Sequence, residues 1–390
     1  MSRSLKMGAV LIASALLGAA PRAHAADAPA AKDVPTFTYD MSWPKPLPNS
    51  WVLGNVVGVA VDARDHIWII QRPSTVTDFE RAADFNPPRA KCCKVAPPVI
   101  EFDQAGNVVQ AWGGPGAGYE WPLPAEAPAA APFMSKFPTG EHTVFIDQKD
   151  NVWLAGNGPG GSQILKFTRD GKFLLQIGKQ GQSKGSGDTM NLKGPAGIDV
   201  DPVAKEVYVA DGYGNRRVIV FDSETGAYKR HWGAYGKAPD DTVPNAYVPP
   251  GGNPAPQFNT VHCVRLSHDG LLYVCDRNNN RIQVFKKDGT FVKEAWVAKE
   301  TIPPSGVTND IAFSPDAEQR FIYIIDGENS KVWILRRETL EVVGSFGRGG
   351  HFAGEFTQAH NLAADSKGNI YVGESLEGKR VQRFVPGRAR

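Results

Sequence analysis

Three things are scarce in this 390-residue chain: cysteine, net charge and long apolar runs. Its four cysteines show no zinc-ribbon spacing, so we expect no sulfur-bound structural zinc. The 43 basic and 41 acidic residues leave a formal charge of +2, which gives no electrostatic reason to expect a nucleic-acid partner or an anionic membrane surface. The apolar run from Ala9 to Ala20 is too short to span a bilayer, and no later segment qualifies. We therefore expect no nucleic acid and no membrane span.

The N-terminus has the pattern of a secretory signal peptide. Arg3 and Lys6 precede the apolar run, and the sequence AHA at 23–25 comes before a cleavage point. Removal of residues 1–25 takes away three basic residues and no acidic one, which lowers the formal charge from +2 to −1. We therefore expect an exported protein, either periplasmic or extracellular.

A two-strand pattern recurs six times along the rest of the chain. Each copy joins two alternating apolar segments across a turn rich in Asp, Asn and Gly, as in TVFIDQKDNVWLA and LAADSKGNIYVG. Most copies are followed by a third strand pattern, such as RIQVF, and often by a fourth, such as FVKEAWV. Antiparallel hairpins with a period of roughly fifty residues are typical of propeller blades. We therefore predict an all-β fold, a six-bladed β-propeller that removes long sheet edges by closing into a ring.

The two ends of the chain are predicted to close this ring together. The sixth repeat ends after its third strand pattern, RVQRF, whereas an unassigned strand pattern, TFTYDMSW, precedes the first repeat. We expect this N-terminal strand to complete the last blade; a mobile N-terminal tail is the alternative. The predicted division is a signal peptide at 1–25, a flexible leader at 26–36 and a single six-bladed propeller at 37–390.

The cysteines form two candidate pairs, and the sequence decides neither. Cys263 and Cys275 fall on neighbouring strands of the fourth blade, where they can pair if the register is right. Cys92 and Cys93 are adjacent in a long insertion, and bridges between adjacent cysteines are strained and rare. Export makes oxidised cysteines more plausible than they are in the cytosol.

Three of the eight histidines occupy the same point of the repeat, in every second copy. They are His142, His262 and His360, each immediately before a strand pattern, and the other copies have Val57, Ala196 and Asn309 there. Alternate blades of a closed ring place three such imidazoles around one axis, which is a natural three-histidine metal site. Three neutral imidazoles with an open fourth position are typical of catalytic zinc, although iron, cobalt or copper would also bind. The other histidines are interpreted as surface or packing residues.

Three further side chains fall at the same end of the blades. Arg72 and Arg277 end the second strands of blades one and four, on opposite sides of the ring, and their guanidinium groups suit bidentate capture of a carboxylate. The alternative is a salt bridge to acids of the blade turns, such as Asp276. Tyr213 lies in the turn DGYGN of blade three, and on spacing alone a tyrosine in such a turn is more often a packing residue than a catalytic one.

Several segments together resemble the peptidyl-alpha-hydroxyglycine alpha-amidating lyase family. They are LGNVVGVAVD with WIIQR, VADGYGNRRVIVFDSETGAYKRHWG, FNTVHCVRLSHDGLLYVCDRNNNRIQVF and FTQAHNLAADSKGNIYVGE. The resemblance covers about residues 50–386. The Asp, Asn and Arg of the third-strand turn are common to all NHL-type repeats and indicate only the fold, a six-bladed propeller of NHL-type repeats. The discriminating residues imply a zinc ion on the three histidines, a catalytic tyrosine and two active-site arginines: His142, His262, His360, Tyr213, Arg72 and Arg277.

The resemblance also implies a structural calcium ion in the central channel. The backbone carbonyls of Val59 and Val144 correspond to two of its ligands in the family. A third ligand is a carboxylate just after the third histidine, where this chain has Asn361; a neutral amide oxygen still ligates calcium, but more weakly. Gln358 stands where the family typically has methionine, which leaves the identity of the substrate open.

The family cleaves a C-terminal alpha-hydroxyglycine into a peptide amide and glyoxylate, so the resemblance implies a monomeric lyase for a small molecule or peptide with a C-terminal carboxylate. The N–C bond breaks as the hydroxyl loses its proton and becomes a carbonyl, and zinc lowers the pKa of that hydroxyl. Tyr213 is the candidate base, provided that a nearby cation favours its ionised form. Arg72 or Arg277 would hold the carboxylate and so fix the scissile bond.

Two other functions remain open. One is a propeller hydrolase, for instance a lactonase, although such propellers usually bind calcium through acidic and amide side chains rather than histidines. The other is a non-catalytic NHL propeller that binds a protein or a cell-wall ligand. Metal-dependent turnover separates both enzymes from the binding protein, and the product separates the enzymes from each other.

Overall fold

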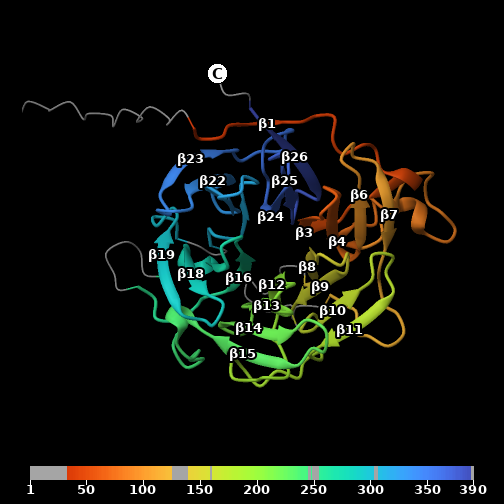
Figure 1. Cartoon of the computed structure of the whole chain (residues 1–390). Coiled ribbons are helices and arrows are strands. Elements are labelled where there is room, and N and C mark those ends of the chain that lie inside the picture. The colour runs from red at the N-terminus through yellow and green to blue at the C-terminus, as the bar shows by residue number, and fades with distance from the viewer. Residues whose placement is uncertain are drawn as a thin grey trace, which may run out of the picture.

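The computed structural model describes residues 33–124, 139–158, 160–244, 247, 254–302 and 306–387. Six four-stranded antiparallel sheets stand around a central axis, with the chain running once around the ring (Figure 1). The predicted all-β, six-bladed propeller is therefore confirmed. The predicted signal peptide at 1–25 lies outside the described residues.

Each blade is a meander whose first strand lies at the axis, except that the last blade takes its outer strand from the N-terminus. Blade one has β3 (Asn55–Val61), β4 (Ile67–Arg72), β6 (Val99–Phe102) and β7 (Val108–Trp112). Blade two has β8 (Gly140–Ile146), β9 (Val152–Asn157), β10 (Ile164–Phe167) and β11 (Phe173–Ile177). Blade three has β12 (Pro195–Asp201), β13 (Glu206–Asp211), β14 (Arg217–Asp222) and β15 (Tyr228–Trp232).

The second half of the ring repeats this plan. Blade four has β16 (Val261–Leu266), β17 (Leu271–Asp276), β18 (Arg281–Lys286) and β19 (Phe291–Trp296). Blade five has β20 (Asp310–Phe313), β21 (Phe321–Asp326), β22 (Lys331–Arg336) and β23 (Val342–Phe346). Blade six has β24 (Ala359–Ala364), β25 (Ile370–Glu374), β26 (Arg380–Pro386) and β1 (Phe37–Tyr39). Outside the blades, β2 (Trp51–Val52) pairs with β5 (Lys94–Val95), and single 3-10 turns cover Pro48–Ser50, Pro73–Thr75, Ala82–Asp84, Ala234–Gly236 and Arg277–Asn279.

An aspartate builds the turn between the first two strands of a blade. Asp147 accepts hydrogen bonds from the backbone N–H groups of Lys149 and Asn151, both at 2.9 Å, and from Trp153 Nε1 at 2.9 Å. The carboxylate thus fixes the tight turn and anchors an aromatic ring of the second strand. Asp62 with Trp68 and Asp365 with Tyr371 repeat the arrangement.

The hydrophobic core is divided among the contacts between neighbouring blades. One cluster joins Trp68 and Ile70 of blade one to Leu154 and Phe167 of blade two. Five comparable clusters join the remaining pairs of neighbours, including blade six with blade one. Since each buried aliphatic or aromatic side chain contributes about 1.5–3 kcal/mol, the ring is held mainly by these faces. Among the described residues, no helix has the length and apolar character needed to cross a membrane.

The N-terminal strand closes the ring as the sequence predicts. β1 pairs antiparallel with β26, with Phe37 opposite Pro386. The ring of Phe37 packs between those of Tyr323 and Phe346, with centroids at 5.4 and 4.7 Å. The end of the predicted flexible leader is not free, because Asp33 pairs with Arg336 at 2.8 Å. Residues 26–32 of the expected leader lie outside the described residues, and its last residues lie against blade five.

Both candidate cysteine pairs are bonded. Cys263 and Cys275 face each other across β16 and β17 and form a disulfide with their Cα atoms 4.8 Å apart. Cys92 and Cys93 are joined as well, in the insertion of blade one. The strand register of blade four, which the sequence left undecided, therefore places Cys263 opposite Cys275 and allows the bond.

Replacing both Cys263 and Cys275 with alanine is expected to lower the free energy of unfolding by about 2–3 kcal/mol. The bridge joins residues 12 positions apart, and its loss returns conformational freedom to the unfolded chain. The denaturant concentration at half-unfolding measures the effect. The matched control is the double alanine variant of Cys92 and Cys93, whose adjacent residues constrain almost no loop. If the double variant at Cys263 and Cys275 unfolds at the same denaturant concentration as the parent, the expectation is contradicted.

Candidate functional site

The three alternate-blade histidines lie inside the inner strands, because each strand begins two or three residues earlier than the sequence-based placement just after the histidine. In β8, β16 and β24 the pairing register with the second strand shifts across His142, His262 and His360. This shift is a β-bulge, which takes one residue out of the strand alternation and redirects its side chain. The same shift occurs at Val57 and Ala196, and Asn309 immediately precedes β20. In the three blades that carry a histidine, the bulge is the local reason why the imidazole faces the axis.

The three imidazoles meet at the axis in a nearly equilateral triangle. The centroids of the rings of His142, His262 and His360 are 4.9–5.0 Å apart in every pair. One ring nitrogen from each lies within 4.8 Å of the other two. All three side chains are buried. The threefold placement predicted from the repeat is therefore what the fold produces.

Each imidazole has its tautomer fixed by the next blade. Nδ1 of His142 lies 3.0 Å from the carbonyl oxygen of Ala196, and Nδ1 of His262 lies 2.6 Å from that of Asn309. Nδ1 of His360 makes the same contact with Val57 at 3.2 Å. A carbonyl oxygen only accepts, so every Nδ1 donates its proton and every Nε2 keeps a free lone pair.

The electrostatics keep these rings neutral. Burial is the main cause that lowers the pKa of all three histidines, and it is reinforced by the charges of nearby arginines and of neighbouring imidazoles. The pKa of His360 falls to about 3. Neutral imidazoles with their lone pairs directed at one point are the form that binds metal.

Tyr213 stands at the meeting point of two of the histidines. Its hydroxyl lies 2.9 Å from Nε2 of His142 and 3.0 Å from Nε2 of His262. The hydroxyl has one proton and these nitrogens are both acceptors, so one close contact has no proton to share. A divalent cation satisfies such a donor set, and the residues present fit a transition-metal ion such as zinc.

Two glycines hold Tyr213 in this position. Gly194 has a φ of +81°, and a Cβ on it would lie 2.7 Å from the Cβ of Tyr213. Gly212 lies so close to β16 that a Cβ on it would be 2.1 Å from the carbonyl oxygen of Val261, the residue before His262. Only glycine allows both approaches. The turn of blade three is thereby pressed against the strand that carries His262.

The two predicted arginines lie beside the histidines and bind neutral acceptors. Arg72 donates from Nε to the carbonyl of Glu141 at 2.7 Å and from Nη2 to Asn157 Oδ1 at 2.8 Å. Burial lowers its pKa to about 10, an effect that Tyr213 and Glu141 partly offset, so Arg72 remains a cation at neutral pH. Arg277 donates from Nη1 to the hydroxyl of Tyr213 at 3.2 Å and from Nε to Asn278 Oδ1 at 3.2 Å.

The salt-bridge alternative for Arg277 is not supported. Asp276 pairs instead with Arg281 at 2.7 Å, and no carboxylate in the described part of the chain forms an ion pair with Arg277. The carboxylate of Glu141 accepts from Trp121 Nε1 at 2.7 Å, and burial raises its pKa. The site therefore joins two arginine cations and a metal donor set in a buried place, which suits an anionic ligand.

The three positions expected to hold calcium lie on the inner strands of blades one, two and six. Val59 and Val144 lie on β3 and β8, two residues beyond the bulge, and both are buried. Asn361 is committed elsewhere: its Oδ1 accepts from Nδ1 of His360, and its Nδ2 donates to Asp310 Oδ2 at 3.2 Å. Asn361 thus brings no negative charge to this place and shares its Oδ1 with His360, and the calcium site stays a prediction.

Sequence reasoning missed one polar group at the same ring position. From the sequence, Asn309 was identified only as the residue of blade five that stands where alternate blades have a histidine. Its backbone carbonyl holds His262, and its side-chain Oδ1 is buried without a hydrogen-bond partner in the described structure. A buried amide oxygen without a partner is costly, so a bound molecule that donates to it would be favoured.

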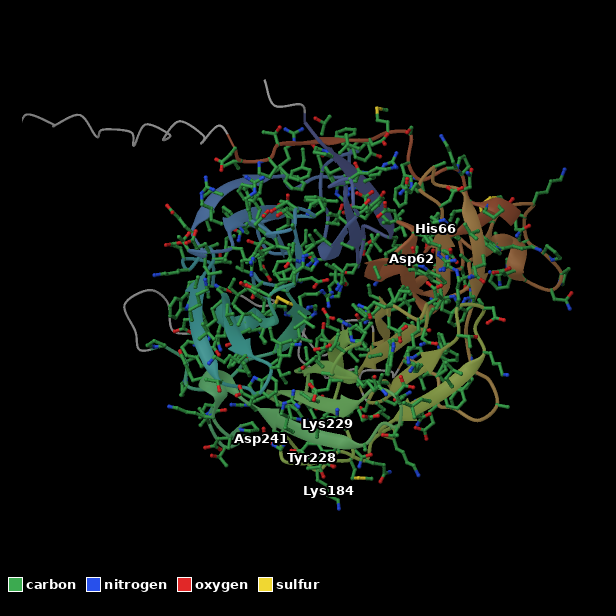
Figure 2. All side chains as sticks on the ribbon, viewed as in Figure 1. Asp62, His66, Lys184, Tyr228, Lys229 and Asp241 are labelled. Carbon is green, nitrogen blue, oxygen red and sulfur yellow. A yellow bond between two sulfur atoms is a disulfide. The ribbon has the colours of Figure 1, made fainter. Side chains whose placement is uncertain are left out.

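A second group of potential metal ligands is filled by an arginine. Asp62, His66 and Glu101 offer atoms within 4.8 Å of one another, and the first two lie beside each other on blade one (Figure 2). Arg169 of blade two reaches between them, 2.8 Å from Asp62 and in contact with Glu101. The group is an ion-pair network that joins two blades, consistent with the predicted packing role of His66.

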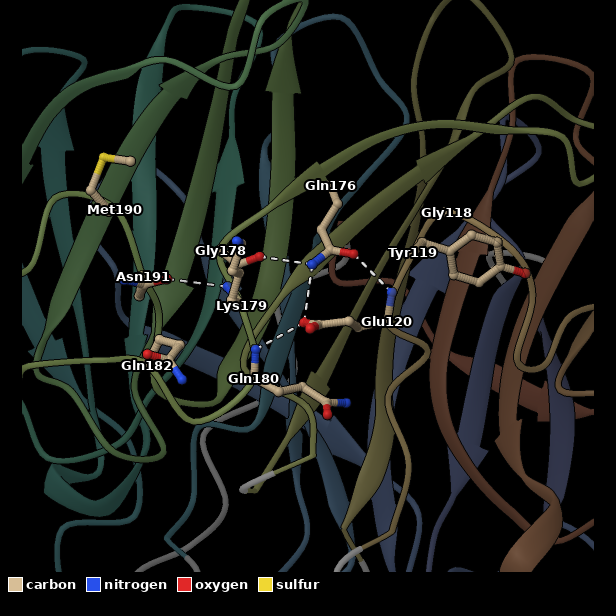
Figure 3. A pocket seen from close by; sticks show the side chains of 10 residues that line it. All are labelled: Gly118, Tyr119, Glu120, Gln176, Gly178, Lys179, Gln180, Gln182, Met190 and Asn191. Atoms are coloured by element: carbon tan, nitrogen blue, oxygen red, sulfur yellow. Dashed lines mark hydrogen bonds between the residues drawn. The ribbon is translucent and has the colours of Figure 1, made fainter.

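A cavity of about 950 Å³ lies at the outer edge of blade two (Figure 3). It is lined mainly by polar side chains that bind one another: Glu120 Oε2 accepts from Gln176 Nε2 at 3.1 Å and from the backbone N–H of Gln180 at 3.0 Å. Gln180 also donates to the carbonyl of Gly160 at 2.7 Å. These contacts hold the loop that follows β11. β11 is the outer strand of blade two, and His142 is on β8, the inner strand of the same blade.

Comparison with known proteins supports the fold and a distant relationship. The NHL repeat model matches residues 258–285. Peptidyl-glycine alpha-amidating monooxygenase B of Xenopus laevis is 27% identical over 253 residues, which cover 64% of this chain and 26% of that protein. The chain thus matches about a quarter of that relative's length. NHL repeat-containing protein 3 of Mus musculus is 24% identical over 367 residues, covering 91% of this chain and 86% of that protein.

Solved structures share the architecture at low identity. A Bacteroides thetaiotaomicron protein of unknown function aligns with a TM-score of 0.50 at 13% identity, covering 86% of this chain and 70% of that one. An inactive virginiamycin B lyase of Staphylococcus aureus with quinupristin aligns with a TM-score of 0.46 at 13% identity, covering 90% and 88%. The chain is a six-bladed β-propeller with an NHL repeat, distantly similar to the peptidyl-glycine alpha-amidating monooxygenases and to NHL repeat-containing protein 3.

Proposed function

We propose that this protein is a metal-dependent carbon–nitrogen lyase that cleaves a C-terminal alpha-hydroxyglycine, or a related carbinolamide, into an amide and glyoxylate. The observation that carries the proposal is the convergence of two unprotonated imidazole nitrogens on the hydroxyl of Tyr213, with a third imidazole beside them. Arg277 supplies a cation at the same hydroxyl. A hydroxyl-bearing carboxylate is the kind of ligand that this combination suits.

His142, His262 and His360 would hold the metal ion, with zinc as the proposed metal. A bound divalent ion supplies Lewis-acid stabilisation of the negative charge that develops on the substrate's hydroxyl oxygen. The histidines contribute without a change of protonation, because their Nδ1 atoms already donate to the carbonyls of the next blade. This arrangement orients the three lone pairs before any ligand arrives.

Tyr213 is proposed to move the proton. As the phenolate it takes the proton of the substrate's hydroxyl, the C–O bond becomes a carbonyl, and the C–N bond breaks. The same proton then passes from Tyr213 to the departing amide nitrogen, so no other reactant is needed. Arg277 donates a hydrogen bond to the same hydroxyl, and its guanidinium carbon lies 5.2 Å from the centre of the tyrosine ring, so a cation stands beside the oxygen that is proposed to move the proton.

The arginines are proposed to bind the substrate's carboxylate. Both are buried, and Arg72 is held by Glu141 and Asn157, so a carboxylate placed between them meets preorganised donors. The partnerless Oδ1 of Asn309 would accept from the substrate's N–H. Gln358, two residues before His360, is half-buried and remains the proposed determinant of the acyl group.

The test is glyoxylate release from a simple N-acyl-alpha-hydroxyglycine by the purified chain that lacks residues 1–25. We expect release above the protein-free blank, its loss after chelation and its return when zinc is restored. The control is the same series with chelator and zinc but no protein, since the substrate also decomposes by itself. A protein that retains one equivalent of zinc but releases no glyoxylate would show that this substrate class is wrong.

A non-catalytic binding function is the second candidate, favoured by one observation. NHL repeat-containing protein 3 aligns over 91% of this chain and 86% of its own length, more of both than the amidating monooxygenase. In that case the metal is structural, and chelation changes stability without any turnover to lose. The hydrolase alternative gains no comparable support, because the metal donor set at the axis consists of imidazoles.

Export is proposed along with the activity. The signal pattern at 1–25 carries this proposal, and the two disulfides suit an oxidising compartment. The periplasm and the extracellular space are both consistent with it.

A further inference from the structure

A buried guanidinium lies in the central channel, three residues beyond one of the histidines. Arg265 on β16 donates from Nη1 to the carbonyl oxygens of Ile198 at 3.0 Å and Val264 at 3.1 Å. Its Nη2 lies 3.0 Å from Asp310 Oδ2 and 2.8 Å from Oδ1. The side chain of Asp310 is 1% exposed and that of Arg265 is 16% exposed. One arginine therefore joins the inner strands of blades three, four and five.

The oxygens that receive Arg265 occupy a repeated position. Ile198 and Val264 stand two residues beyond the bulge of their blades, as Val59 and Val144 do in blades one and two. Backbone carbonyls that converge on a channel are the oxygen ligands that a hard cation takes. In this chain, the carbonyls of Ile198 and Val264 already accept hydrogen bonds from a cation of the protein itself, the guanidinium of Arg265.

Asp310 stands at the position of blade five that Asn361 occupies in blade six. Asp310 is the residue after the bulge position of blade five, and Asn361 is the equivalent residue of blade six. Asn361 donates its amide to Asp310 at 3.2 Å. A second carboxylate, Asp199, accepts from the backbone N–H of Leu266 at 3.0 Å, beside Arg265. The negative charge of the channel thus stands on Asp310 and Asp199 and faces the arginine.

We propose that the guanidinium of Arg265 takes the place of a structural calcium ion in the central channel, so that the propeller is stable without calcium. A calcium ion in the same ring would be repelled by the guanidinium, and Asn361 offers it no negative charge where a carboxylate is expected. Arg265 connects three inner strands through four close contacts: two with the carbonyl oxygens of Ile198 and Val264, and two with the carboxylate oxygens of Asp310. This inference does not depend on the proposed lyase activity.

The test begins with the unaltered chain that lacks residues 1–25. After purification, elemental analysis is expected to find no equivalent of calcium, and the melting temperature is expected to be the same in EGTA and in added calcium. One equivalent of bound calcium, or a melting temperature that falls in EGTA, would overturn the proposal. EGTA also binds zinc tightly, so zinc is restored after the EGTA treatment and melting temperatures are compared only between samples of equal zinc content, which the same elemental analysis reports. The readouts are metal content and melting temperature, so the result is independent of whether glyoxylate is released.

Two variants extend the test. Arg265→Ala is expected to melt about 5 °C lower, because Asp310 and Asp199 lose their cation, and to be partly restored by calcium that the unaltered chain ignores. Arg265→Lys, which keeps the charge, is the variant to measure if the alanine variant does not fold, and calcium is expected to leave its melting temperature unchanged. Arg320→Ala, on an exposed arginine paired with Asp316, is the matched control and should melt as the parent does. An Arg265→Ala protein as stable as the parent would overturn the proposal.

Discussion

Replacing His262 with alanine is expected to abolish both metal binding and glyoxylate release. The imidazole is one of three donors at the axis and lies 3.0 Å from the hydroxyl of Tyr213. Two remaining histidines hold a divalent ion far less tightly than three. Metal stabilisation of developing charge is worth several kcal/mol, and each 1.36 kcal/mol is tenfold in rate, so turnover should fall about 10³-fold or more. Elemental analysis and the glyoxylate assay measure the two losses on the same preparation.

The control for this variant is another histidine of the same hairpin. His268 lies in the exposed turn between β16 and β17, six residues from His262, and away from the other two axial histidines. His268→Ala should keep the metal and the turnover of the parent. If His262→Ala keeps one equivalent of metal, the three histidines are not the metal site, and the proposed function loses the observation that carries it.

Replacing Tyr213 with phenylalanine is expected to lower kcat by about 10²- to 10⁴-fold while the metal is retained. The change removes only the hydroxyl that contacts two histidines and Arg277. General base catalysis by a positioned side chain contributes an effect of this size. The metal should stay because each histidine keeps its contact with the carbonyl of the next blade. Steady-state kinetics on enzyme of known metal content separate the two effects.

A tyrosine outside the site provides the comparison. Tyr228 on β15 is partly exposed, and its hydroxyl lies 2.9 Å from His231 on the outer strand of blade three. Tyr228→Phe removes the same atom from a different place and should leave kcat unchanged. Full turnover by Tyr213→Phe at normal metal content would assign the tyrosine to packing, the role that spacing alone favours.

Much of the site was predictable because it repeats. The three histidines could be found from the sequence because residues at one register of a closed ring meet at its axis, and Arg72, Arg277 and Tyr213 could be placed at the same end by the same register. The sequence did not reveal the bulge that redirects each histidine, since the shift depends on how the first strand pairs with the second. It also did not reveal that Asn309, which breaks the histidine pattern, leaves a buried oxygen without a partner.

The calcium expectation shows what register alone leaves undecided. The resemblance supplied ligand positions at Val59, Val144 and Asn361, but whether an oxygen is free depends on its neighbours in space. Asn361 is bound by His360 and Asp310, and Asp310 is paired with Arg265, 45 residues earlier in the chain. No periodic pattern marks Arg265, because it occurs in one blade only. Its role follows from contacts between blades.

The sequence by itself determined the architecture: six hairpin repeats, their alternating apolar faces, the strand at the N-terminus that completes blade six and the three alternate histidines. These features are local patterns, since each depends on residues close together in the chain. The tertiary structure alone decided the proton positions on the histidines, the partner of each arginine and the cation of the channel. These depend on ring closure, which brings together residues such as Val57 and His360, separated by 303 positions, and no local pattern encodes such a contact.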